Sequence, residues 1–174
     1  FRRPTAVARS ADGSRLFVVD ADNHRVQVLD AATGAPLAAW GTRIGPAEAD
    51  AGAAATGSGF VDPFGIAVDA AGGVFVSDRG AHRVLKFSAA GERIGGFGGR
   101  GPADRDLWKP GDLAVATDGR IIVVDYGNHR PKLFDADGTW WATFGTGRAV
   151  TRDDGRRERP AARPVPRRTG GGER

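Results

Sequence analysis

Short apolar runs separated by turn residues recur along roughly the first 150 positions of the chain. One group of four such runs lies at Asp112–Ala116, Arg120–Asp125, Arg130–Phe134 and Thr139–Phe144. The second run is rich in β-branched residues, which is typical of a buried strand. Asp137 and Gly138 stand between the last two runs, and Asp-Gly tolerates the positive φ of a tight hairpin. The pattern predicts four antiparallel strands, and apolar residues at helical spacing are not evident.

The same group of marks occurs three times. Each unit has a proline before its first strand, an aspartate at the end of its second strand, a His-Arg pair four residues after that aspartate, and a closing aromatic-Gly pair. The prolines are Pro4, Pro63 and Pro110, and the closing aromatics are Trp40, Phe97 and Phe144. Units of about 40 residues with four strands are typical of β-propeller blades. We therefore predict an all-β fold with blades at 1–45, 60–101 and 107–148, and an insert at 42–59.

These marks resemble the NHL repeat family over residues 1 to about 148. The resemblance rests on an apolar-x-x-Pro start, the Val-x-Asp strand end, the Asn-His-Arg corner and the closing aromatic-Gly pair. Ala81 replaces the Asn once, and Leu107 stands where the other two units open with Phe1 and Phe60. It implies a propeller that typically has six blades, so three units would form half a ring. Pro131 stands where the other units have Val26 and Val84, and a proline cannot donate a ladder hydrogen bond. We therefore expect the third blade to be the least regular.

The positive charge of the chain is concentrated at its C-terminal end. The whole chain has a net charge of +4, and residues 151–174 hold eight arginines against four acidic residues. The rest of the chain is therefore neutral, which argues against a basic binding face on the blades. We expect residues 149–174 to be a disordered tail rich in Arg, Pro and Gly, because so few apolar residues cannot offset the entropy of ordering. Nucleic acid would bind, if at all, through 151–174.

Two sets of repeated residues could carry chemistry, and we interpret both as structural. The histidines occupy one equivalent position in three blades, so they are expected to lie apart and not to share a metal ion. Each repeated aspartate has an arginine five residues later, which favours local ion pairs over a catalytic carboxylate pair. The residues are Asp20, His24, Arg25, Asp78, His82, Arg83, Asp125, His129 and Arg130. We predict no catalytic residue, metal ligand or cofactor, and the absence of cysteine excludes disulfides.

Loops on one face of the propeller are the predicted binding surface, because rigid scaffolds commonly carry binding residues on loops. The candidates are Asp22, Arg79, Trp108 and Tyr126, near the inserts at 42–59 and 99–106. One of the adjacent residues Trp140 and Trp141 should also point away from the core.

Three functional hypotheses remain open. The first is a non-catalytic module that binds a protein, peptide or glycan through its loop face. The second is a lyase or hydrolase similar to peptidyl-hydroxyglycine lyase or to lactonase-type propellers, completed by blades outside this chain; the inner strands here offer Asp69 and Asp112. The third is RNA or DNA binding through the tail. Two chains could also close the ring as a homodimer. No membrane span is predicted, and the resemblance slightly favours an extracytoplasmic bacterial location.

Overall fold

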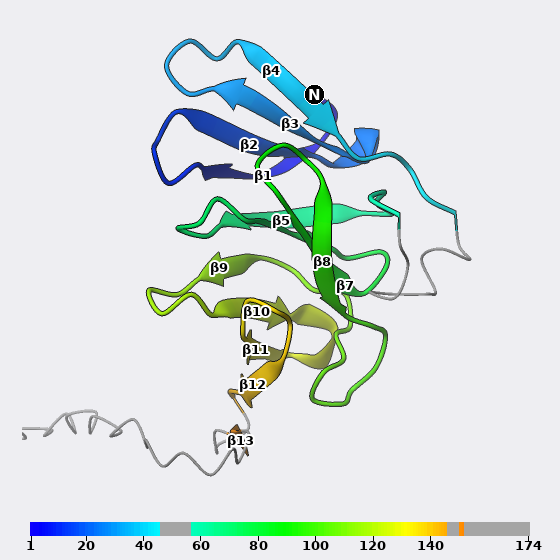
Figure 1. The fold of residues 1–174 in the computed structure, drawn as a ribbon. Helices are drawn as coiled ribbons and strands as arrows, with labels where there is room; N and C mark the ends of the chain where they lie inside the picture. The colour runs from blue at the N-terminus through cyan, green and yellow to red at the C-terminus, as the bar shows by residue number, and fades with distance from the viewer. Residues whose placement is uncertain (46–56, 146–149, 152–174) are drawn as a thin grey trace, which may run out of the picture.

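The computed structural model describes residues 1–45, 57–145 and 150–151, and these form three β-sheets stacked side by side (Figure 1). Each sheet contains a four-stranded antiparallel meander, as the sequence predicts. Blade 1 contains β1 (Pro4–Arg9), β2 (Arg15–Asp20), β3 (Arg25–Asp30) and β4 (Pro36–Trp40). Blade 2 contains β5 (Pro63–Val68), β6 (Val74–Asp78), β7 (Arg83–Phe87) and β8 (Arg93–Gly98). Blade 3 contains β9 (Leu113–Val115), β10 (Ile121–Asp125), β11 (Arg130–Phe134) and β12 (Trp140–Thr143).

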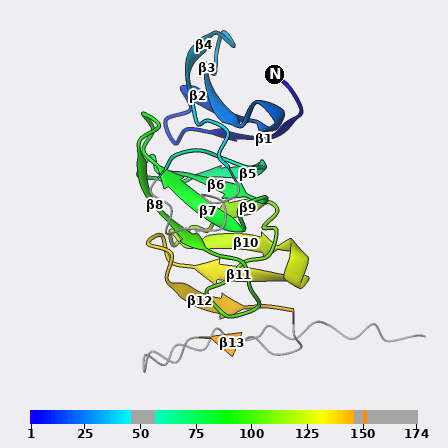
Figure 2. The same ribbon diagram turned by 90° about the vertical axis from the view of Figure 1, so that its right-hand side faces the viewer.

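The first strands of the blades lie next to one another, because β5 contacts both β1 and β9. This arrangement places β1, β5 and β9 along the inner edge of the stack, as Figure 2 also shows. Short turns join the second strand of each blade to the third. In blades 1 and 3 these corners are the 3₁₀ turns η1 (Ala21–Asn23) and η3 (Tyr126–Asn128). In the described part of the chain, no helix is long or apolar enough to cross a membrane.

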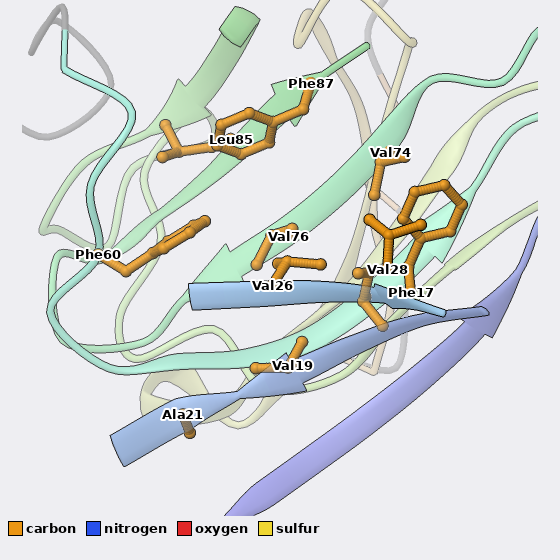
Figure 3. Close-up of a cluster of buried hydrophobic side chains, with 11 residues drawn as sticks. Phe17, Val19, Ala21, Val26, Val28, Phe60, Val74, Val76, Leu85 and Phe87 are labelled. Carbon is orange, nitrogen blue, oxygen red and sulfur yellow. The ribbon is translucent and has the colours of Figure 1, made fainter. Parts of the chain in front are cut away.

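Alternation along the strands gives each blade two apolar faces, one for each neighbour. Between blades 1 and 2, the side chains of Phe17, Val19, Val26 and Val28 meet Val74, Val76, Leu85 and Phe87 in one buried cluster (Figure 3). Between blades 2 and 3, a second cluster contains Phe75, Val84 and Phe97 on one side and Ile121, Val123 and Phe134 on the other. Among the described residues, the two buried apolar clusters therefore lie between neighbouring blades.

A second contact between blades uses the closing aromatic residue. The ring of Trp40 lies 4.5 Å from that of Phe87 in blade 2, and Phe97 lies 4.5 Å from Phe134 in blade 3. Gly91 and Gly138 have positive φ angles, and a Cβ atom at either would collide with Trp40 or Phe97 respectively. The closing aromatic of one blade thus packs between a phenylalanine and a turn that contains glycine, both from the next blade.

Blade 3 is the least regular blade, and Pro131 contributes to this. Its inner strand β9 has three residues, whereas β1 and β5 have six. The carbonyl of Pro131 accepts a bond from the N–H of Phe144 at 3.0 Å, which places the missing proline N–H on the side of β12. Since the return bond cannot form, β12 ends at Thr143, one residue before the closing aromatic.

Residues 150–151 differ from the expected tail. Val150–Thr151 form β13, which pairs antiparallel with β12 and adds a fifth strand to blade 3. The expectation of disorder for the remainder of the tail falls on residues outside the described part. The same holds for the middle of the insert at 42–59, of which residues 46–56 are not described.

Candidate functional site

The repeated aspartates hold each corner against the segment that leads into the same blade. We define the lead-in segments as residues 2–3, 61–62 and 108–109. The backbone N–H of Arg2 donates to Asp20 at 2.6 Å, that of Asp62 donates to Asp78 at 2.9 Å, and that of Trp108 donates to Asp125 at 2.7 Å. All three aspartate side chains are fully buried. Buried carboxylates that already accept several hydrogen bonds fix loop geometry and have little capacity left for substrate.

The arginine of each His-Arg pair lies near its own aspartate. The distances between nitrogen and oxygen are 2.8 Å for Arg25 and Asp20, 3.5 Å for Arg83 and Asp78, and 3.8 Å for Arg130 and Asp125. The aspartates thus each serve their own blade. The structure gives no contact between carboxylates of different blades, within the residues it describes.

The environments of Asp20 and Asp78 move their pKa values in opposite directions. Burial acts to raise the pKa of Asp20, but hydrogen bonds from the Arg2 N–H and from Asn23, Gln27 and Arg25 outweigh it and lower the pKa well below the usual range. Burial raises the pKa of Asp78, and the backbone N–H groups and Arg83 only partly oppose it. Ala81 replaces the asparagine in this blade, so Asp78 lacks the amide that Asn23 and Asn128 donate in the others.

The histidines adopt a left-handed conformation at the end of each corner. Their φ angles are 52° for His24, 56° for His82 and 54° for His129. The Nδ1 atom of His82 accepts a hydrogen bond from the backbone N–H of Lys109 at 3.0 Å, which links blade 2 to the lead-in segment of blade 3. The Nδ1 atom of His24 has no partner among the described residues, because the N–H of Asp62 donates to Asp78 instead. No three metal-binding side chains gather anywhere in the described part.

A chain of alternating charges crosses from blade 1 to blade 2 beside the corners. Arg3 Nε lies 2.6 Å from Asp22, and another nitrogen of the same guanidinium lies 2.7 Å from Asp62. Asp62 also lies 3.0 Å from Arg79, whose guanidinium stacks 4.7 Å above the ring of Phe64. Burial acts to raise the pKa of Asp62, but the hydrogen bonds from Arg3 and Arg79 lower it overall. The predicted residues Asp22 and Arg79 are therefore joined through Arg3 and Asp62, a link that a sequence pattern of separate repeats does not show.

Two exposed aromatic residues stand on the same side of blade 3. Tyr126 is 63% exposed and Trp108 is 41% exposed. They lie close together, because the N–H of Gly127 donates to the carbonyl of Trp108 at 2.7 Å. A Cβ atom at Gly127 would collide with the carbonyl oxygen and the side chain of Trp108, so this glycine allows Trp108 to approach the corner closely. We call the set of Arg3, Asp22, Asp62, Arg79, Trp108 and Tyr126 the corner face.

A buried lysine, which the sequence analysis did not single out, fixes the insert at 99–106. Lys132 Nζ donates to the carbonyls of Ala103 at 2.7 Å and Asp106 at 2.5 Å, and lies 3.3 Å from Asp125. Burial lowers its pKa, although the charge of Asp125 acts to raise it. Lys132 occupies the strand position of Gln27 in blade 1 and of Leu85 in blade 2. A charged residue at this position of the strand is the sequence signal that could have identified Lys132 as a structural residue. Arg130 and Asn128 also donate to carbonyls of this insert.

The inner strands line a hollow of about 400 Å³ bounded by Thr5, Val7, Phe64, Ile66, Asp112 and Leu113. Asp112 is exposed there and accepts the N–H of Leu113. Asp69, the other inner-strand carboxylate, instead accepts the N–H of Gly73 at 2.6 Å and lies 3.7 Å from Lys86. The two acids are thus held in different local contacts.

The two adjacent tryptophans of β12 point to different sides. Trp140 packs against the cluster between blades 2 and 3, and its indole N–H donates to Thr143 at 3.1 Å. The ring of Trp141 lies beneath the guanidinium of Arg120, 3.9 Å from its centre. Arg120 therefore covers one face of the Trp141 ring, whereas Trp140 is the tryptophan that packs on the core.

Comparisons with known proteins agree with this architecture. The family model for the NHL repeat matches residues 60–87 and 107–130, which lie in blades 2 and 3. No curated protein matches the chain in sequence.

Similar solved structures include two of virginiamycin B lyase from Staphylococcus aureus. A catalytically inactive form with quinupristin has a TM-score of 0.60 and 12% sequence identity, and the match covers 83% of this chain and 41% of the lyase. A selenomethionine form has a TM-score of 0.57 and 13% sequence identity, and the match covers 81% of this chain and 40% of the lyase. Hydrazine synthase from Kuenenia stuttgartiensis has a TM-score of 0.50 and 15% identity, over 85% of this chain and 49% of that one. The chain thus spans less than half of these structures, and at such identities the likeness concerns the fold. The family model thus identifies NHL repeats at residues 60–87 and 107–130, and the three stacked sheets have the architecture of β-propeller blades.

Proposed function

We propose that the chain is a binding module that holds an extended peptide segment of a partner protein on its corner face. The observation that carries this proposal is the alternation of carboxylate and guanidinium groups from Asp22 to Arg79 at the corners of blades 1 and 2, together with the exposed rings of Trp108 and Tyr126 at the corner of blade 3. Tyrosine, tryptophan and arginine are the residue types that dominate binding energy at protein interfaces. A row of both charge signs matches a peptide that carries both signs better than a uniformly charged polymer.

The frame below the corner face supports the proposal. Buried aspartates bind the lead-in segments, so the exposed side chains project from loops that are held in place by hydrogen bonds of 2.6–2.9 Å. Preorganised loops lose less entropy when a ligand binds.

The alternative of a propeller lyase or hydrolase has one observation in its favour, the fold shared with virginiamycin B lyase. Such an activity would use the inner hollow, where Asp112 is the exposed carboxylate. The blades of this chain would then supply one acid, and further groups would have to come from elsewhere. Nucleic-acid binding through 151–174 concerns residues of which only Thr151 is described.

A peptide library displayed on phage and a glycan array would test the proposal on the full chain. We expect enrichment of peptides that carry both acidic and basic residues, with affinity reduced at least about tenfold by Tyr126→Ala and by Arg79→Ala. Ile94→Ala, which changes an exposed residue of β8, is the matched control and should leave binding unchanged. Peptides that bind both corner variants normally would overturn the proposal. Glycan binding without peptide binding would also overturn it.

A further inference from the structure

The outer face of blade 3 repeats the residues with which blades 1 and 2 bind their neighbours. Ile122 and Val124 occupy the strand positions of Phe17 and Val19 in blade 1, which are buried against blade 2. In blade 3 they are 37% and 43% exposed. The face therefore has the apolar pattern with which blade 1 packs against blade 2, whereas blade 2 has Phe75 and Ser77 at these two positions.

The closing aromatic of blade 3 gives a second, independent indication. Trp40 and Phe97 each stack on a phenylalanine of the following blade, Phe87 and Phe134. Phe144 is the third member of this series, and it is 37% exposed. The position of Phe87 and Phe134 is occupied in blade 1 by Leu29, which is half-buried on the outer side of that blade.

The histidine corner gives a third indication. His82 accepts the N–H of Lys109, a lead-in residue with a φ angle of 50°. His129 is the equivalent histidine of blade 3 and is exposed. Arg3 is the equivalent lead-in residue of blade 1, and its φ angle of 48° matches that of Lys109. Blade 1 thus carries the backbone conformation that a histidine of this series binds.

We propose that blade 3 of one copy docks head-to-tail against blade 1 of a second copy of this chain. In this contact, Ile122 and Val124 of one copy pack against Leu16 and Val18 of the other. Phe144 of the first copy packs against Leu29 of the second, and His129 accepts a hydrogen bond from the Arg3 N–H. Both halves of the interface are present on one chain, so two copies can form two such contacts and close into a single ring. Closure covers the apolar faces that each copy exposes alone. This inference does not depend on what the corner face binds.

Sedimentation equilibrium of the full chain measures the proposal directly, since the monomer mass is 18.2 kDa. We expect a dimer, and we expect Phe144→Glu and Leu29→Arg each to raise the dissociation constant at least about a hundredfold, because each leaves a charge in an apolar contact. An equimolar mixture of the two variants should dimerise again, with one unaltered contact and one in which the glutamate faces the arginine. Ile94→Glu is the control, because Ile94 is exposed and lies outside the proposed contact, and this variant should sediment with the mass of the dimer.

Circular dichroism and urea unfolding would establish that both variants fold. A chain that stays monomeric at about 100 μM, where even a weak specific contact would be populated, would overturn the proposal. So would a dimer that Leu29→Arg leaves intact, because it would have to use a surface other than blade 1. Failure of the mixture to dimerise, with both variants folded, would equally contradict a head-to-tail contact.

Discussion

The side chain of His82 holds the backbone of Lys109, 27 residues further along the chain, by a hydrogen bond of 3.0 Å from the lysine N–H to Nδ1. His24 has the same backbone conformation, but its Nδ1 atom lacks this partner among the described residues. A comparison of His82 with His24 therefore measures how much the hydrogen bond between blades adds to the free energy of unfolding, apart from the contribution of the corner.

Replacing His82 with alanine should destabilise the chain by about 1 kcal/mol more than replacing His24 with alanine. Both substitutions place alanine at a positive φ, so that strain cancels in the comparison, and the lost hydrogen bond remains. Urea unfolding of the two variants at low protein concentration measures the difference. Equal losses would mean that the bond to Lys109 contributes nothing to stability.

Replacing Asp20 with asparagine should cost about 2 kcal/mol at pH 7, because the carboxylate accepts several charge-assisted or backbone hydrogen bonds. The pKa of Asp20 is lower in the folded chain than in the unfolded one. Its stabilising contribution is thus fully present above about pH 4 and is lost as the pH falls below that value. Unfolding at pH 7 and at pH 2.5 should show a smaller loss at the lower pH.

Asp78→Asn should show the opposite dependence on pH. Because burial raises the pKa of Asp78 in the folded chain, its titration lowers stability as the pH rises from about 4 towards that raised pKa. The asparagine variant lacks this titration, so its loss of stability relative to the parent chain should be larger at pH 4 than at pH 7. Parallel curves for the two aspartate variants would contradict the opposite directions assigned here.

Replacing Phe97 with alanine should cost about 3–4 kcal/mol, because this ring is buried between Phe134 and Gly138 and its removal leaves a cavity. The equivalent change at Phe144 should cost less than about 1 kcal/mol in the monomer, since that ring is partly exposed. Urea unfolding at submicromolar concentration keeps any dimer dissociated. Similar costs at both positions would show that Phe144 is already covered within one chain.

Replacing Lys132 with methionine should cost about 3 kcal/mol and loosen the insert at 99–106, because Asp125 and two carbonyls lose a buried donor. Lys132→Gln should be milder, since Gln27 donates to Asp20 from the same strand position at 3.1 Å. Lys86→Met is the control, with its amine 3.7 Å from Asp69 and partly exposed. Hydrogen exchange of the insert should rise in Lys132→Met alone, and an unchanged rate would refute the role assigned to this lysine.

The repeated residues predicted the blades because a blade needs the same groups in each copy. The aspartate that ends each second strand has its partners within its own blade at nearly equal separations in every copy, so its role follows from spacing. The partners of the closing aromatics and of His82 lie in the next blade, and spacing within one repeat does not identify them. The charge chain through Arg3 and Asp62 could not be predicted in this way, since its partners come from different blades. Lys132 also escaped prediction, because its partners are carbonyls of an insert that the other blades do not share.

The lead-in segments are held through their backbone, and this leaves the side chains at those positions free to differ. Residues 3, 62 and 109 are arginine, aspartate and lysine, yet they occupy equivalent places beside the same kind of corner. A change of side-chain charge at any of them alters what the surface attracts, and the N–H groups of Arg2, Asp62 and Trp108 that bind the aspartates stay in place. Single substitutions at these positions can therefore change the charge of the surface beside the corners, with little effect on the stability of the blades.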